Sequence, residues 1–135
     1  MKQVFVDSNV FLRYLTQDDE DQSSRARRLL SRAAAGEVRL ITGPPVLFEI
    51  VWTLRSAYGQ SRERTLEILS SIVAMPGLWM TDGRIVEGAM ELARTTGAEF
   101  ADAYIASSAQ TVGSDQIATF DRRHFKRLGA DLYSM

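Results

Sequence analysis

The chain has 135 residues, of which 45% are hydrophobic, and its formal net charge is −1. This size and composition predict a single globular domain over residues 1–135 with an ordinary hydrophobic core. The absence of cysteine excludes disulfides, thiolate zinc sites and cysteine nucleophiles. The apolar stretches fall short of the roughly 20 residues of a membrane span, and the first strand begins too early for a signal peptide. We therefore expect a cytoplasmic protein that contacts no membrane.

Hydrophobic periodicity and turn residues predict strands that alternate with one or two helices along the chain. The expected strands are residues 2–6, 38–42, 78–81 and 116–120, with a fifth if residues 131–133 also pair. The expected helices are residues 8–15, 22–35, 44–58, 61–73, 82–97, 99–112 and 121–128. Strands joined through helices pair in parallel, and a parallel sheet needs helices on both faces. The sequence therefore predicts an α/β fold, a three-layer α/β/α sandwich around a central parallel sheet of four or five strands.

Acidic residues recur where apolar segments end. Asp7 follows a predicted strand and Asp121 follows another, whereas Glu49 and Asp102 interrupt the otherwise apolar starts of two helices. Functional groups in parallel α/β sheets gather at the carboxyl ends of the strands, so we expect these four carboxylates to converge. Carboxylates in apolar surroundings are costly unless they are paired or bound to a metal. Four oxygen ligands of this kind predict a site for Mg²⁺ or Mn²⁺.

Each acid also has a purely structural interpretation, as a helix cap or as a complement to the helix dipole. The hypothesis of a metal site depends on the four occurring together. Glu99 lies three residues before Asp102 on the same helical face and is left open as a further member. His124, the only histidine, is expected at a surface or an interface, while Trp52 and Trp79 are expected in the core.

The basic residues are strongly skewed toward arginine. Lys2 and Lys126 are the only lysines among 16 basic residues. Arginine suits bidentate contacts with phosphate, but a GC-rich genome would produce the same skew without any function. The basic residues that follow Asp121 could likewise hold phosphates or simply form a solvated helix face.

The order of these motifs resembles that of the PIN-domain family, and within it the VapC-like toxins of bacterial toxin–antitoxin pairs. The resemblance spans nearly the whole chain and rests on four segments, which are residues 6–10 (VDSNV), 48–50 (FEI), 100–106 (FADAYIA) and 119–121 (TFD). Each segment is short, but their order and spacing together are specific. No member of the family's four-acid pattern is missing.

The resemblance implies a metal-dependent endoribonuclease that cleaves RNA with Mg²⁺ or Mn²⁺. Asp7 and Asp102 would be the principal metal ligands, and Glu49 and Asp121 would complete the catalytic acidic cluster. Asn9 and Thr119 would be polar supports. In such chemistry the metal activates water and offsets charge on the leaving oxygen. The resemblance also implies binding by a small VapB-like antitoxin and a homodimer, with residues 22–35 and 61–73 as candidate contact helices.

Two other functions remain open from the residues alone. A phosphoacceptor signalling domain would also be a small α/β sandwich with acids at strand ends. Such a domain needs a lysine at the last strand exit, where this chain has the sequence Phe120-Asp121-Arg122. A non-catalytic RNA-binding or scaffold module would need none of the four acids. Metal-dependent nuclease activity, compared between the wild type and Asp7→Asn, distinguishes these functions.

Overall fold

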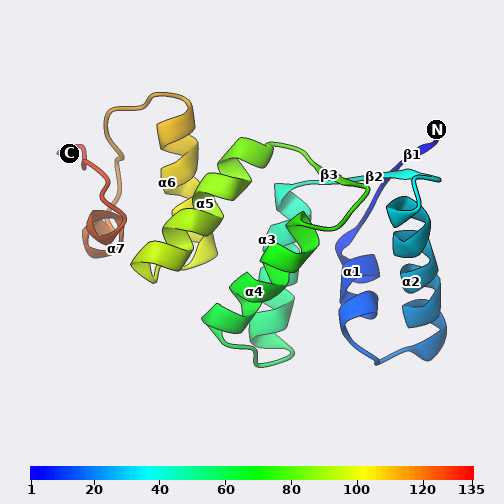
Figure 1. Cartoon of the computed structure of the whole chain (residues 1–135). Coiled ribbons are helices and arrows are strands. Elements are labelled where there is room, and N and C mark those ends of the chain that lie inside the picture. Colours follow the sequence, from blue (N-terminus) through cyan, green and yellow to red (C-terminus); the bar gives the residue numbers. More distant parts are fainter. The chain divides into compact units, whose positions relative to one another are not determined.

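The structure is a computed structural model that describes residues 1–135 (Figure 1). In chain order the elements are β1 (Gln3–Phe5), α1 (Ser8–Leu15), α2 (Glu20–Ala34), β2 (Arg39–Thr42), α3 (Pro44–Ser56), α4 (Arg62–Val73), β3 (Leu78–Met80), α5 (Gly83–Thr96), α6 (Phe100–Thr111) and α7 (Arg122–Arg127). The chain divides into two compact units, Met1–Thr81 and Asp82–Met135. Each unit is described by itself.

The first unit contains a parallel sheet with the strand order β1-β2-β3. Two helices, α1 and α2, connect β1 to β2, and α3 and α4 connect β2 to β3. The register sets Phe5 beside Ile41 and Ile41 beside Trp79. At the ends of the first two strands, the buried Thr42 hydroxyl donates a hydrogen bond of 3.0 Å to the Val6 carbonyl. The α/β class and the parallel sheet flanked by helices, both predicted from the sequence, are confirmed.

The core of the first unit joins the sheet to its helices. Its fully buried large side chains include Phe11 from α1, Leu40 from β2, Leu47 and Ile50 from α3, and Leu69 and Ile72 from α4. Helices α1 and α2 pack side by side as an antiparallel pair (Figure 1). The first of these helices begins immediately after the first strand, so its N-terminus lies at the carboxyl end of that strand.

Gly77 allows the turn before β3 to pass close to α2. Its φ of +80° lies in the left-handed region, which residues with a Cβ rarely adopt. A Cβ at this position would also lie 2.3 Å from the carbonyl oxygen of Ala33. Backbone conformation and backbone contact therefore both require glycine here.

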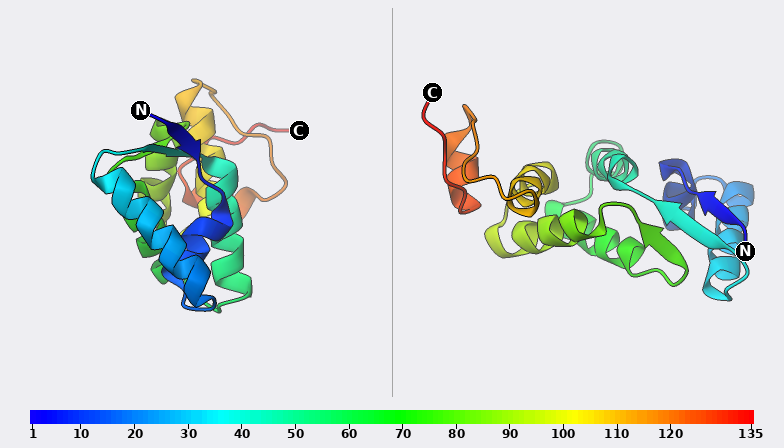
Figure 2. Two further views of the ribbon diagram at one scale, coloured as in Figure 1. Left: turned by 90° about the vertical axis from the view of Figure 1, so that its right-hand side faces the viewer. Right: turned by 90° about the horizontal axis from the view of Figure 1, so that it is seen from above.

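The second unit is built on the helices α5 and α6, which pack against each other (Figure 2). Gly88 makes this approach close, because a Cβ there would lie 2.4 Å from the Ser107 hydroxyl oxygen. That hydroxyl donates a hydrogen bond of 2.9 Å to the Ile85 carbonyl. Side chains from all three helices are buried in this unit, including Val86, Ala89, Phe100, Ala103, Phe125 and Leu128.

The sheet has three strands, so the prediction of four or five strands was wrong in number. Residues 116–120 and 131–133, predicted as strands, meet in one isolated parallel bridge between Ile117 and Leu132. The Ile117 amide donates to the Asp131 carbonyl at 2.8 Å, and the Tyr133 amide donates to the Ile117 carbonyl at 2.9 Å. One bridge of this kind is too short to form a strand ladder, although the predicted parallel direction is present.

The two tryptophans are not in the core, contrary to prediction. Trp52 is 71% exposed and Trp79 is 57% exposed. The ring of Trp79 lies under the Arg39 guanidinium at 4.0 Å, so a cation–π contact rather than apolar packing covers it. No helix in the chain combines the length and apolar character needed to cross a membrane.

Candidate functional site

In the first unit, Asp7 and Glu49 are connected through Ser8. Asp7 is the N-cap residue of α1, and its carboxylate accepts a hydrogen bond of 2.7 Å from the Ser8 amide. The Ser8 side chain is 7% exposed, and its hydroxyl donates to Oε1 of Glu49 on α3. A single buried residue therefore fixes one carboxylate through its backbone and the other through its side chain.

In the second unit, Asp102, Asp121 and His124 form a cluster. Asp102 lies in the first turn of α6, and Asp121 is the N-cap residue of α7. One ligand atom from each of the three side chains lies within 4.8 Å of the others. Asp102 is half-buried, whereas Asp121 and His124 are exposed. This unit thus brings together two of the four predicted acids and adds a histidine.

Several contacts orient the Asp121 carboxylate. Its Oδ2 lies 2.7 Å from Nδ1 of His124, and its Oδ1 accepts a bond of 3.4 Å from the His124 amide. An ionised carboxylate only accepts hydrogen bonds, so Nδ1 carries the proton in this contact. The side-chain hydrogen bond from His124 holds the pKa of Asp121 below its usual value, and the His124 amide and charge act in the same direction.

The two predicted polar supports lie in different units. Thr119 supports Asp121, because its hydroxyl oxygen accepts a hydrogen bond of 2.9 Å from the Asp121 amide. Asn9 lies in the first turn of α1 and lines a cavity between α1 and α2. Glu99, which the sequence left open, is the N-cap residue of α6.

The family model of the PIN domain matches the chain over residues 4–131. The chain belongs to the PIN domain family. No curated protein matches it. PIN domains are generally nucleases and typically bind divalent metal ions, so membership indicates a nuclease-type fold that acts on nucleic acid. The match covers both units, including all four predicted acids.

The side chains of the second-unit cluster fit a hard divalent cation. The carboxylates of Asp102 and Asp121 offer the oxygen donors that Mg²⁺ and Mn²⁺ prefer. The imidazole of His124 forms a hydrogen bond with the Asp121 carboxylate and so fixes the orientation of that carboxylate. Such contacts to ligand side chains commonly set the geometry of metal sites.

Sequence reasoning missed the role of two residues in this PIN domain. Ser8 was not singled out, although a small hydroxyl residue directly after the Asp7 strand exit is well placed to contact a neighbouring helix. His124 was expected only at a surface or an interface. The signal was its spacing: a histidine three residues after an N-cap aspartate lies above that carboxylate in the first helical turn.

Proposed function

We propose that this PIN domain is a cytoplasmic, Mg²⁺- or Mn²⁺-dependent endoribonuclease and the toxin of a VapBC-type toxin–antitoxin pair. The observation that carries the nuclease proposal is the cluster of Asp102, Asp121 and His124 within a PIN domain. A scaffold or RNA-binding module would have no use for carboxylates gathered in this way. The toxin assignment rests on the resemblance of the chain's motifs to VapC-like proteins.

The proposed principal metal ligands are Asp7 and Asp102, by likeness to the family. Glu49 and Asp121 complete the set of catalytic acids. A bound divalent cation would supply water activation and compensation for the charge of the phosphodiester. Without such compensation, carboxylates would repel the RNA backbone, so metal and carboxylates are required together.

In this proposal, hydrogen bonds from neighbouring residues hold the carboxylates in a defined orientation. Ser8 does this for Glu49, and its hydroxyl occupies one lone pair of Oε1. His124 and Thr119 do it for Asp121, from the side chain and the backbone respectively. Fixed carboxylates lose less conformational entropy on binding a cation or substrate than mobile ones.

The first test is cleavage of purified RNA with Mg²⁺, with Mn²⁺ and with a chelator. The wild type is expected to cleave internal phosphodiester bonds only when a divalent cation is present. Asp102→Asn, which keeps the size of the side chain but removes its charge, is the matched inactive variant. Cleavage that continues in the presence of the chelator would contradict the metal-dependent mechanism.

The partner proposal has a separate test in cells. Expression of the wild type alone is expected to arrest growth, whereas Asp7→Asn is expected to be harmless. Co-expression of a small antitoxin encoded beside the gene should restore growth and give a stable complex with the toxin, which we expect to be a homodimer. A wild-type chain that is harmless at high expression and binds no such protein would exclude the toxin role and leave the nuclease proposal standing.

A further inference from the structure

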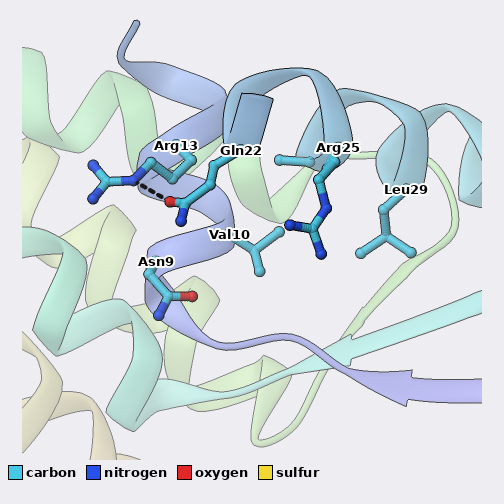
Figure 3. A pocket seen from close by; sticks show the side chains of 7 residues that line it. Asn9, Val10, Arg13, Gln22, Arg25 and Leu29 are labelled. Atoms are coloured by element: carbon cyan, nitrogen blue, oxygen red, sulfur yellow. Dashed lines mark hydrogen bonds between the residues drawn. The ribbon is translucent and has the colours of Figure 1, made fainter. Parts of the chain in front are cut away.

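A cavity of about 380 Å³ lies between α1 and α2 of the first unit (Figure 3). Its volume falls within the range of typical ligand pockets, roughly 300 to 1,000 Å³. The residues that line it are Asn9, Val10, Arg13, Gln22, Arg25, Ala26 and Leu29. None of them is acidic, and two carry guanidinium groups. The cavity is therefore suited to an anion.

Arg13 is oriented by a specific contact. Its Nε donates a hydrogen bond of 2.7 Å to Oε1 of Gln22, which connects α1 to α2, and its terminal nitrogens point away from Arg25 (Figure 3). A guanidinium has five N–H donors, and this bond uses one of them. The terminal nitrogens of Arg13 keep the remaining donors, and their planar arrangement matches two oxygens of a phosphate.

Arg25 provides the second positive charge. Its side chain extends from α2 toward Val10 of α1 in Figure 3. Its Nη1 lies 3.7 Å from Oδ2 of Asp21, beyond the length of a good hydrogen bond, and both side chains are largely exposed. An exposed ion pair of this kind contributes little, so an incoming phosphate can compete for the guanidinium.

The remaining lining residues complement a nucleotide rather than a bare anion. Val10, Ala26 and Leu29 provide apolar surface, against which a ribose or a base can pack. Asn9 carries an amide that can both donate to and accept from a base edge or a 2′-hydroxyl. Single-stranded RNA, whose bases can be splayed out and bound individually, suits a cavity of this size.

The position of the cavity relates it to the proposed catalytic residues. Asn9, which lines the cavity, lies in the first turn of α1, and Asp7 is the N-cap residue of the same helix. We propose that the α1–α2 cavity is a positioning subsite for single-stranded RNA, in which Arg13 and Arg25 each contact a phosphate that is not itself cleaved. This inference rests on the proposed ribonuclease function and adds a substrate contact to it.

The test measures binding separately from cleavage. A short fluorescein-labelled single-stranded RNA is titrated with the protein in the presence of a chelator, and fluorescence anisotropy gives Kd over a range of salt concentrations. Arg13→Gln and Arg25→Gln should each raise Kd about tenfold, as expected for loss of a charge-assisted hydrogen-bonding partner. Each should also reduce the slope of log K against log salt by about 0.7, the value for one lost contact to a single strand.

Arg28→Gln is the matched control, because it removes one positive charge from the same helix at a residue that does not line this cavity. It should leave the salt slope unchanged and alter Kd much less than Arg25→Gln does. Equal effects of Arg25→Gln and Arg28→Gln would mean that α2 attracts RNA through general positive charge, and the subsite would be wrong. Unchanged binding in both cavity variants would also overturn it.

The outcomes separate this inference from the proposed function. If RNA binds through Arg13 and Arg25 but is never cleaved with Mg²⁺ or Mn²⁺, the subsite stands and the nuclease proposal fails. If RNA is cleaved while both variants bind it normally, the nuclease proposal stands and the subsite fails. A polyglutamate peptide is the competing probe. Binding of that peptide, but not of RNA, with dependence on both arginines would replace the RNA assignment with an acidic-peptide site.

Discussion

The two units of the chain hold their carboxylates by different chemical means. In the first unit, the buried Ser8 hydroxyl donates to Glu49. In the second, the exposed His124 imidazole lies against Asp121. The donor of the first contact is a neutral hydroxyl on a short, buried side chain, whereas the second contact comes from a ring nitrogen on an exposed side chain. The first carboxylate is therefore held within the packed interior, and the second is held where solvent also reaches it.

Each unit contains one closely packed glycine, and the two glycines differ in the kind of atom that they face. Gly77 of the first unit faces a backbone carbonyl, that of Ala33, and has a positive φ. Gly88 of the second unit faces a side-chain hydroxyl, that of Ser107, and lies within a helix. A hydroxyl can rotate away from an added methyl group, but a carbonyl fixed in the chain cannot. Replacement of Gly77 by a larger residue should therefore be more destabilising than the same replacement of Gly88.

The largest expected effect is the loss of cleavage when a proposed metal ligand is replaced in either unit. Asp7→Asn and Asp102→Asn should each reduce the cleavage rate by more than about 100-fold, which exceeds the usual effect of a residue that only supports a ligand. Both variants should remain folded, because removal of one of several like charges relieves repulsion. Cleavage rates with saturating Mn²⁺, together with thermal unfolding, measure the two properties. If only one variant loses activity, the idea that both units serve the reaction is wrong.

The next largest effect is on the free energy of unfolding when Gly77 or Gly88 is replaced by alanine. Gly77→Ala should lower the free energy of unfolding by about 2 kcal/mol or more, because it adds left-handed strain to a backbone clash. Gly88→Ala should cost about 1 kcal/mol or less, since the better helix propensity of alanine offsets the crowding of Ser107. Urea unfolding of both variants gives the comparison. A larger loss for Gly88→Ala would show that α5 and α6 are packed too rigidly for the hydroxyl to move.

Ser8→Ala tests the neutral contact of the first unit. Loss of the hydroxyl leaves Glu49 without the donor that orients it, so cleavage should fall about tenfold, with weaker apparent affinity for the metal. Ser8→Thr, which keeps a hydroxyl, is the matched control and should retain more of the activity. The cleavage rate is measured against Mn²⁺ concentration. If Ser8→Ala cleaves RNA with the same dependence on Mn²⁺ concentration as the wild type, the Ser8 hydroxyl is not needed to orient Glu49.

His124→Ala should have a smaller effect on cleavage, below about tenfold, because the metal supplies water activation. A loss of about 100-fold or more would instead mark His124 as a general acid or base. The same variant tests the pKa of Asp121 in the metal-free protein. The wild-type pKa should lie below the ordinary aspartate value of about 3.9, and His124→Ala should raise it toward that value.

The sign of the corresponding effect on stability follows from that lowered pKa. Because folding favours the ionised carboxylate, Asp121 contributes to stability above its ordinary pKa, and this contribution disappears as pH falls through the lowered value. Carboxyl NMR titration of the metal-free wild type and variant measures the shift directly. An identical Asp121 pKa in both proteins would remove His124 as its cause.

Most of the fold was determined by local patterns in the sequence. The strand of residues 3–5 and the helices around it were predicted because apolar spacing and helix-capping residues act over a few positions. The parallel pairing followed from the helices between the strands. The four acids were found in the same way, because each lies at an element boundary that the sequence marks. Their roles as metal ligands remain predictions.

Other features were decided only by tertiary structure. The strand count differed because Ile117 and Leu132 pair through one bridge, and pairing depends on a distant segment rather than on β propensity. Trp79 was wrongly predicted in the core because its ring is contacted by Arg39 of the neighbouring strand rather than by apolar side chains. The contact between Ser8 and Glu49 joins residues 41 positions apart. The sequence specifies which side chains stand at the ends of elements, but the packing of those elements decides which side chains meet.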